Sequence, residues 1–193
     1  MIIGITGASG AGKSVACNVF LQNGFFIVDL DKIAHEIYDT DPLCVNEVKN
    51  AFGEKILDGD GRIMRKKLGE IVFSDGEKLN ILNKITHKYI LKKALSELDG
   101  KENAVIDAPL LFETELLKKC DITLGILSDD KLKTERITKR DGVKKTYAQN
   151  RLKMQKSDDF FEKNCTFCIR NDSTADEFER KIALFIKNEV KKG

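Results

Sequence analysis

Residues 7–14 form the segment whose spacing is most suited to chemistry. Their sequence, GASGAGKS, matches the pattern GxxxxGK[ST] at every fixed position. An apolar run, Ile2 to Thr6, precedes the segment, and residues 14–21 have helical spacing before Gly24. Glycines allow the tight turn that aims successive backbone N–H groups inward, and a helix N-terminus adds partial positive charge. The spacing therefore predicts a phosphate-binding loop between a strand and a helix.

Two side chains of this loop carry the chemistry expected of a nucleotide site. Lys13 can bridge the β- and γ-phosphates of a triphosphate, and the hydroxyl of Ser14 can ligate Mg²⁺. ATP and Mg²⁺ are therefore the expected cofactors. The alternative is a plain glycine-rich turn with an exposed lysine. The residues predicted to contact the nucleotide form one continuous run: Ala8, Ser9, Gly10, Ala11, Gly12, Lys13, Ser14 and Val15.

A phosphate loop does not by itself separate kinases from GTPases or motor ATPases. The sequence contains no NKxD tetrapeptide of the kind that GTPases use for guanine, and its 193 residues are too few for a long motor ATPase. A kinase acting on a small molecule fits this length.

The other apolar runs predict the sheet that must position the loop. Short runs rich in apolar residues recur at 25–28, 104–106, 122–127 and 166–169. Helical patterns separate them, which is typical of a parallel sheet covered on both faces. We therefore expect an α/β fold in which a parallel five-stranded sheet is the middle layer of a three-layer α/β/α arrangement.

Two long helical segments lie between these predicted strands. The first fills the stretch between the second and third runs, and the second, which is dense in Lys and Arg, is broken near Asp141 and Gly142. We interpret residues 1–193 as a single domain, with a helical substrate-binding insertion at about 32–102 and a helical lid at about 131–156.

Composition narrows the class of protein further. The 33 Lys and Arg against 31 Asp and Glu leave a formal net charge of +2, which does not indicate nucleic acid or an anionic membrane as partner. We found no signal peptide and no run that approaches a membrane span. We expect a cytoplasmic protein, either a monomer or a small homo-oligomer.

The five cysteines are odd in number and scattered, which argues against a disulfide framework. Cys165 and Cys168 form a CxxC, but no second pair at zinc spacing accompanies it. Reduced thiols are the expected state, and a metal or redox role for this pair is the minor alternative.

Four stretches together resemble the dephospho-CoA kinase family, which catalyses the last step of coenzyme A synthesis. They are residues 2–7 leading into the loop, VDLDKIA at 28–34, DAPLLFE at 107–113, and the arginines and glutamine spread over 136–155. The third stretch is the most discriminating. The resemblance implies transfer of the γ-phosphoryl group of ATP to the ribose 3′-hydroxyl of dephospho-CoA.

The resemblance also implies roles for individual residues. Asp31 would orient the ribose hydroxyl and accept its proton, and Lys13 and Arg140 would complete the catalytic set. Arg136 and Arg151 would join Arg140 in a basic lid. The remaining implied contacts are with substrate at Asp31, Arg65, His87, Pro109 and Leu110, and with the adenine at Asn171.

Each of these roles has a plainer alternative. Asp31 could merely cap a helix that begins near Lys32, and Asp107, at the end of the third run, could cap a turn instead of reaching Mg²⁺. His87 could be an ordinary helix residue. For the whole chain, the rivals are a nucleoside or nucleotide kinase of the same fold and a nucleotide-binding switch that acts through a partner protein.

Overall fold

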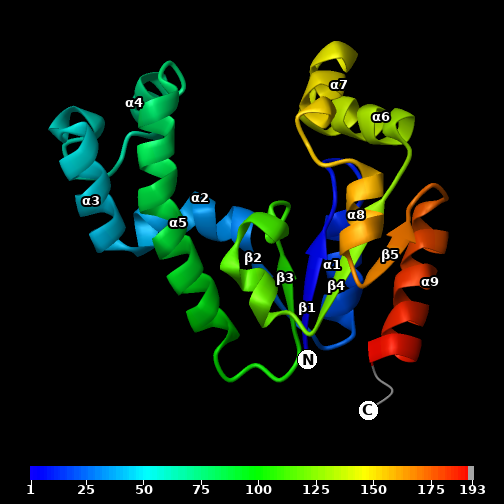
Figure 1. Ribbon diagram of the computed structural model, residues 1–193. Coiled ribbons are helices and arrows are strands. Elements are labelled where there is room, and N and C mark those ends of the chain that lie inside the picture. The colour runs from blue at the N-terminus through cyan, green and yellow to red at the C-terminus, as the bar shows by residue number, and fades with distance from the viewer. Residues whose placement is uncertain (191–193) are drawn as a thin grey trace. The chain divides into compact units, whose positions relative to one another are not determined.

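The computed structural model describes residues 1–190, and its contacts divide the chain into two compact units. Met1–Asp29 and the chain from Gly100 onward form the first, which we call the sheet unit. Leu30–Asp99 form the second, the helical unit, which contains no strand of the sheet (Figure 1).

Within the described residues, the sheet unit contains a five-stranded, entirely parallel sheet in the order β2-β3-β1-β4-β5. The predicted architecture is therefore confirmed, and β2 and β5 each begin one residue later than their runs predict. The strands are β1 (Ile2–Thr6), β2 (Phe26–Asp29), β3 (Ala104–Asp107), β4 (Ile122–Leu127) and β5 (Phe167–Arg170).

The strand order places the phosphate loop at the point where ligands bind in such sheets. β1 lies between β3 and β4; the chain passes from β1 to the edge strand β2 on one side, and after β3 it crosses to β4 and β5 on the other, so the winding direction reverses. In open α/β sheets, ligands bind at the carboxyl ends of the strands where the winding direction changes. The loop that follows Thr6 begins at this point.

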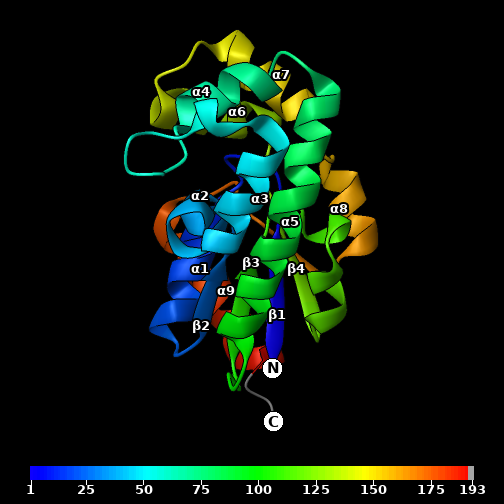
Figure 2. The same ribbon diagram turned by 90° about the vertical axis from the view of Figure 1, so that its left-hand side faces the viewer.

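Helices cover both faces of the sheet. α1 (Lys13–Gln22) and α9 (Ala175–Phe185) pack together on one face, and α8 (Asp158–Asn164) packs on β4 and β5 from the other (Figure 2). The sequence did not predict α8. The apolar stripe predicted for the last helix is confirmed, because Phe178 and Ile182 are fully buried in the core.

Two basic helices follow β4 at the carboxyl edge of the sheet (Figure 1). They are α6 (Asp130–Asp141) and α7 (Lys145–Lys153), and the break between them occurs at Gly142, as predicted. Gly142 has a φ of 65°, the left-handed conformation in which glycine ends helices. Short helical turns, η2 (Leu111–Glu113) and η3 (Glu115–Lys119), connect β3 to β4.

The helical unit is a small bundle with its own core. The side chains of Asp41 and Asp75 accept hydrogen bonds from the first turns of α3 and α5, which fixes where these helices begin. The long α5 packs against the other three helices. The elements are α2 (Leu30–Thr40), α3 (Pro42–Phe52), η1 (Glu54–Ile56), α4 (Arg65–Val72) and α5 (Gly76–Leu98), and their buried residues include Ile37, Val48, Ile56, Val72 and Ala94.

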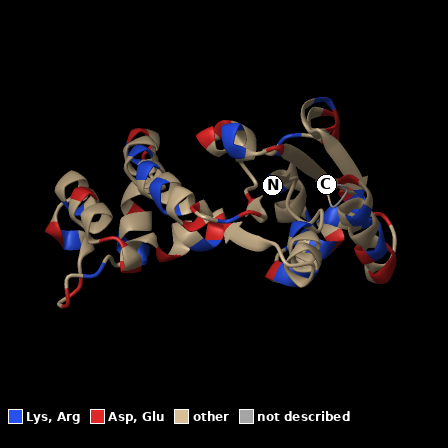
Figure 3. Cartoon of the chain, turned by 90° about the horizontal axis from the view of Figure 1, so that it is seen from below, with Lys and Arg blue, Asp and Glu red and all other residues tan. Residues whose placement is uncertain are grey.

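Charged side chains of both signs are interspersed along the helices of each unit (Figure 3). Among residues 1–190, no helix is both long enough and apolar enough to cross a membrane.

Replacing Phe178 by alanine should lower the free energy of unfolding by about 3–5 kcal/mol, because it leaves a cavity in the core that α9 shares with α1. Urea denaturation followed by circular dichroism measures this loss. Leu184→Ala, on the same helix but at a side chain that is 57% exposed, should cost less than about 1 kcal/mol. Equal losses in the two variants would contradict the assignment of Phe178 to the core.

Candidate active site

The loop between β1 and α1 adopts backbone conformations, among them those of Gly7 and Gly12, that only glycine allows. Gly7 has a φ of 141°, and a Cβ atom there would lie 2.3 Å from the carbonyl oxygen of Ile126. Gly12 has a φ of 112°, and a Cβ atom there would lie 2.2 Å from Nδ2 of Asn171. The glycines of the motif therefore allow both the backbone conformation of the loop and its close packing against neighbouring residues.

Several backbone N–H groups of this loop are available to a ligand. Those of Gly10, Gly12 and Ser14 find no acceptor among residues 1–190, whereas the N–H of Ala11 donates to the carbonyl of Ala8 at 3.2 Å. No side chain caps the N-terminus of α1. Helix N-termini and inward-facing loop amides bind phosphate, so the predicted phosphate loop has the geometry that its motif requires.

Lys13 lies along the inside of the loop. Its Nζ donates hydrogen bonds to the carbonyl oxygens of Gly7, at 2.8 Å, and Ala8, at 3.3 Å. The ammonium group is thus held beside the backbone that would surround a phosphate, where it can approach the terminal phosphates of a nucleotide.

The carbonyl side of the loop is held by two residues from distant elements. Nδ2 of Asn171 donates to the carbonyl of Ala11 at 2.8 Å, and Nη1 of Arg136 donates to the carbonyl of Gly10 at 3.2 Å. Arg136 also donates to the carbonyl of Asn171 at 2.9 Å, so the two residues support each other. Asn171 is buried in this role, and its contact with adenine stays a prediction.

Two carboxylates end neighbouring strands beside the loop. Asp29 of β2 and Asp107 of β3 lie in register, and Asp107 is also in register with Ile5 of β1. Burial raises the pKa of the Cys17 thiol far above its ordinary value, and the charge and hydrogen bond of Asp107 raise it further. Asp29 also raises this pKa and Lys13 lowers it, which places these charges around one point.

This donor set fits a magnesium ion that is bound mainly through phosphate. Magnesium takes one or two protein oxygens and completes its coordination with phosphate oxygens and water. Ser14 at the start of α1 offers a hydroxyl, and Asp29 and Asp107 offer carboxylates at the adjacent strand ends. Among residues 1–190, no group of three or more His, Cys, Asp or Glu side chains could hold a metal alone.

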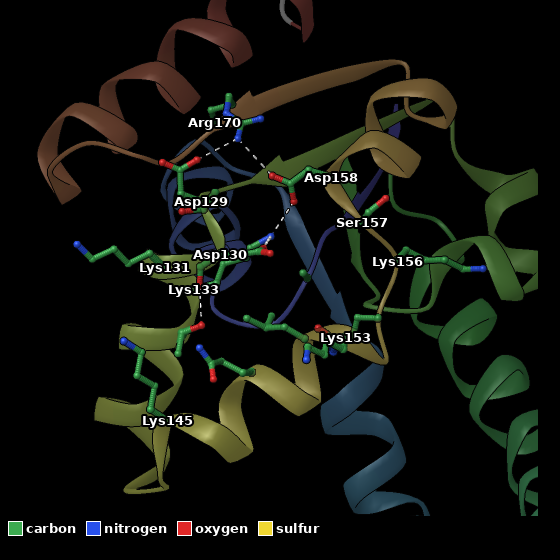
Figure 4. A pocket seen from close by; sticks show the side chains of 16 residues that line it. Asp129, Asp130, Lys131, Lys133, Lys145, Lys153, Lys156, Ser157, Asp158 and Arg170 are labelled. Atoms are coloured by element: carbon green, nitrogen blue, oxygen red, sulfur yellow. Dashed lines mark hydrogen bonds and ion pairs between the residues drawn. The ribbon is translucent and has the colours of Figure 1, made fainter.

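A cavity of about 1050 Å³ adjoins the loop at Ala8 and is rich in cationic side chains (Figure 4). Lys133 is 4% exposed and pairs with Asp130 at 2.9 Å and Asp158 at 2.8 Å. Burial alone would lower the pKa of Lys133, but the hydrogen bonds to these two carboxylates outweigh burial and raise it. Arg170 also pairs with Asp158, as Figure 4 shows.

The remaining lysines give this cavity a net positive charge. Lys131, Lys145 and Lys153 line it and make no ion pair with a carboxylate among the residues described. An uncompensated cluster of cations beside a phosphate loop attracts a polyphosphate.

Arg140 reaches the loop from α6. Its Nε donates to Asp141 at 2.6 Å, and its Nη2 makes a long contact of 3.5 Å with the hydroxyl of Ser9. Asp141 also accepts from Arg151 of α7 at 3.1 Å. The hydrogen bond from Arg140 is the main cause that lowers the pKa of Asp141, so one carboxylate joins two of the three arginines of the predicted lid.

Three of the predicted residues belong to the helical unit and are described within it. Asp31 lies inside the first turn of α2, which begins at Leu30, so it does not cap a helix beginning near Lys32. Arg65 donates to Nδ1 of His35 at 2.9 Å and to Asp39 at 2.8 Å. His87 is exposed on α5.

The two predicted substrate contacts after β3 lie in the sheet unit. The carbonyl of Pro109 accepts a hydrogen bond from the hydroxyl of Thr6 at 3.3 Å. The next side chain, Leu110, is 59% exposed, whereas Leu111 is buried against Gly4. Leu110, unlike Leu111, is therefore open to contact with a ligand.

Sequence reasoning missed three residues as parts of the site. Gln155 accepts from the loop N–H of Ser9, His35 fixes Arg65, and Asp29 lies beside Asp107. Asp29 and Gln155 lie within motifs that the sequence analysis recognised. No spacing rule, however, pairs Gln155 with Ser9, which is 146 residues away in the chain.

The cysteine pair forms a partly buried thiol contact. Cys165 and Cys168 share a hydrogen bond, and both sulfur atoms lie over Gly125. Burial raises the pKa of Cys165 to about 12, so its thiol is protonated at neutral pH. All five cysteines are free thiols.

The strand order, the phosphate loop and the basic helices beside it define an α/β kinase of the phosphate-loop class. Residues 1–177 match the family model described as dephospho-CoA kinase. The chain belongs to this family, and the predictions of the family and of a kinase enzyme are confirmed.

Relatives support this assignment over nearly the whole chain. A dephospho-CoA kinase of Fusobacterium nucleatum subsp. nucleatum is 37% identical over 187 residues, covering 96% of both proteins. A solved protein from Thermus thermophilus superposes with a TM-score of 0.81 at 26% identity, covering 98% of both chains. A dephospho-CoA kinase from Campylobacter jejuni gives a TM-score of 0.67 at 27% identity, covering 96% of this chain and 95% of that one.

Replacing Asn171 by alanine should weaken ADP binding and lower the free energy of unfolding by about 1–3 kcal/mol, because the carbonyl of Ala11 loses its donor. Calorimetric titration with ADP and urea denaturation measure the two effects. Asn150→Ala, at an exposed position on α7, serves as the control and should change neither. Unaltered ADP affinity in the Asn171 variant would show that the loop does not depend on this contact.

Proposed function

We propose that this protein transfers the γ-phosphoryl group of ATP to the ribose 3′-hydroxyl of dephospho-CoA. The observation that carries the proposal is the phosphate loop of a dephospho-CoA kinase family member, with the N–H groups of Gly10, Gly12 and Ser14 available to phosphate oxygens. Cytoplasmic location and a monomer or small homo-oligomer stay expectations from the sequence.

The reaction needs an alcohol oriented in line with the terminal phosphorus. The ribose oxygen forms a bond to the γ-phosphorus, the bond from that phosphorus to the β–γ bridging oxygen breaks, and ADP leaves with the bond electrons. We assign Asp31 to orient the hydroxyl and accept its proton, which a carboxylate can do within hydrogen-bond reach. Lys13 compensates charge on the terminal phosphates.

Magnesium, when bound, neutralises charge on the β- and γ-phosphates. Ser14 would hold it directly, and Asp107, with Asp29 beside it, would hold it directly or through water. The arginines of the lid, Arg140 and Arg151, would face the transferring group, and their closure would exclude water that could hydrolyse ATP.

The contacts of α2 support a common substrate-binding face in the helical unit. Asp31, His35 and Asp39 are spaced by four residues, so they follow one another along one side of the helix. Arg65 is bound to the last two of these. With about 5.4 Å per helical turn, its guanidinium lies one to two turns from Asp31.

This spacing suits the chemistry of dephospho-CoA. The diphosphate of that molecule is attached to C5′ of the same ribose whose 3′-hydroxyl reacts. A guanidinium group is a good ligand for phosphate oxygens, and contacts to His35 and Asp39 restrict the side chain of Arg65 before substrate arrives. Arg65 would thus bind the diphosphate while Asp31 holds the hydroxyl. His87 and Leu110 would contact other parts of the substrate.

Replacing Asp31 by asparagine should lower kcat by about 10²–10⁴-fold, because the amide keeps the size of the side chain but cannot accept a proton. ATP affinity should change by less than about threefold, since binding of the triphosphate rests on the loop. Coenzyme A formation from dephospho-CoA and Mg²⁺-ATP measures turnover. Glu36→Gln, an exposed position on the same helix, is the matched control.

Two results would contradict these assignments separately. Wild-type kcat in the Asp31 variant would exclude the base role alone. A folded wild-type protein that forms no coenzyme A, or that prefers a nucleoside from a panel of acceptors, would contradict the proposed substrate.

Replacing Arg65 by alanine should raise KM for dephospho-CoA by about 10–100-fold with little change in KM for ATP, because a charged hydrogen bond to the diphosphate is lost. Arg62→Ala, at an exposed arginine of the same unit, should leave both constants near wild type. Steady-state kinetics with each substrate varied in turn measures this split. A parallel rise in both KM values would argue against a specific role in dephospho-CoA binding.

A further inference from the structure

The N–H of Ser9, in the phosphate loop, donates to a glutamine instead of to the backbone. Its acceptor is Oε1 of Gln155, at 2.8 Å, from the turn that joins α7 to α8. Both residues belong to the sheet unit. The basic helical segment is therefore tied to the loop through one of the groups that line the phosphate site.

The NH₂ group of the Gln155 side chain is not used in the contact with Ser9. A glutamine side chain has one acceptor oxygen and an NH₂ group with two donors. With Oε1 held by Ser9, Nε2 finds no acceptor among residues 1–190. Gln155 also lines the cationic cavity next to Ala8, so two N–H donors lie where the loop and this cavity meet.

Ser9 is also approached from the other basic helix. Nη2 of Arg140 lies 3.5 Å from the hydroxyl of Ser9, while Gln155 accepts from its backbone N–H. A guanidinium group and a carboxamide therefore both contact one loop residue. Both are donors that suit phosphate oxygens, and neither adds negative charge beside them.

We propose that Gln155 is a further catalytic residue, whose Oε1 fixes the Ser9 N–H while its Nε2 donates a hydrogen bond to the γ-phosphoryl group. This inference rests on the proposed kinase function. It makes Gln155 selective for the triphosphate, because ADP lacks the oxygens that Nε2 would contact. Because Gln155 follows α7, the same contact would make the position of the lid depend on whether a γ-phosphoryl group is bound.

The test separates the acceptor from the donor of the same side chain. Gln155→Glu keeps an oxygen that accepts from Ser9 but replaces the NH₂ donor with a charged oxygen next to the phosphates. Gln155→Ala removes both. Asn150→Asp is the control, because it adds a carboxylate to an exposed position of α7 that neither lines the cavity nor contacts Ser9.

The readout is binding of ADP and of a non-hydrolysable ATP analogue, each by calorimetric titration with Mg²⁺, together with kcat. We expect Gln155→Glu to bind the analogue about 10–100-fold more weakly, as is typical for loss of a hydrogen bond to a charged group, with ADP affinity within about threefold. We expect kcat to fall by a similar factor. Gln155→Ala should show the same pattern more weakly, and Asn150→Asp should stay within about threefold throughout.

Two outcomes would overturn the proposal. Equal losses of ADP and analogue affinity would show that Gln155 acts only on the shape of the loop through Ser9. Wild-type affinities and kcat in Gln155→Glu would show that the NH₂ group of Gln155 makes no hydrogen bond to the γ-phosphoryl group. If Gln155→Ala is poorly folded by thermal denaturation, the near-isosteric Gln155→Glu still decides the question. The nucleotide affinities are measured without a phosphoryl-acceptor substrate, so this test remains valid even if dephospho-CoA is not the substrate.

Discussion

Phosphate binding by backbone N–H groups requires that the same backbone be held through its carbonyl oxygens. In this protein Asn171 and Arg136 contact the carbonyls of Ala11 and Gly10, so the adjacent N–H groups can face a ligand. Gly12 leaves room for the amide of Asn171, where any other residue would collide with it. The two supporting residues come from the end of β5 and from α6, so the loop depends on the packing of the whole sheet unit.

The charged side chains beside the loop fall into two groups: some are neutralised by carboxylates, and others can interact with a ligand. Lys133 is too deeply buried to remain charged alone, and Asp130 and Asp158 compensate it. This group of three charges stabilises the structure and adds no positive charge to the cavity. The cations that can act on a polyphosphate are those left without a carboxylate among the described residues, including Lys131 and Lys153.

In the helical unit, a side chain and not the backbone is positioned to bind an anion. His35 and Asp39 hold the guanidinium of Arg65, which limits the conformations that a long side chain must lose when it binds an anion. The ring of Tyr38 lies 5.7 Å from that guanidinium, and burial raises the pKa of Tyr38 to about 12, so the ring stays neutral. Arg65 is thus restricted by neighbours from α2 before any ligand is considered.

The sequence by itself determined the phosphate loop, the five strands, the break at Gly142 and the family. The loop, the strands and the break depend on short spacings and on local apolar periodicity, which the order of residues records directly, and the family followed from the resemblance of four stretches to known motifs. Only the tertiary structure decided that Asn171 supports the loop, that Asp29 lies beside Asp107, and that Gln155 accepts from Ser9. The physical reason is that a hydrogen bond between residues far apart in the chain depends on how strands and helices pack, and residue type alone does not name the partner.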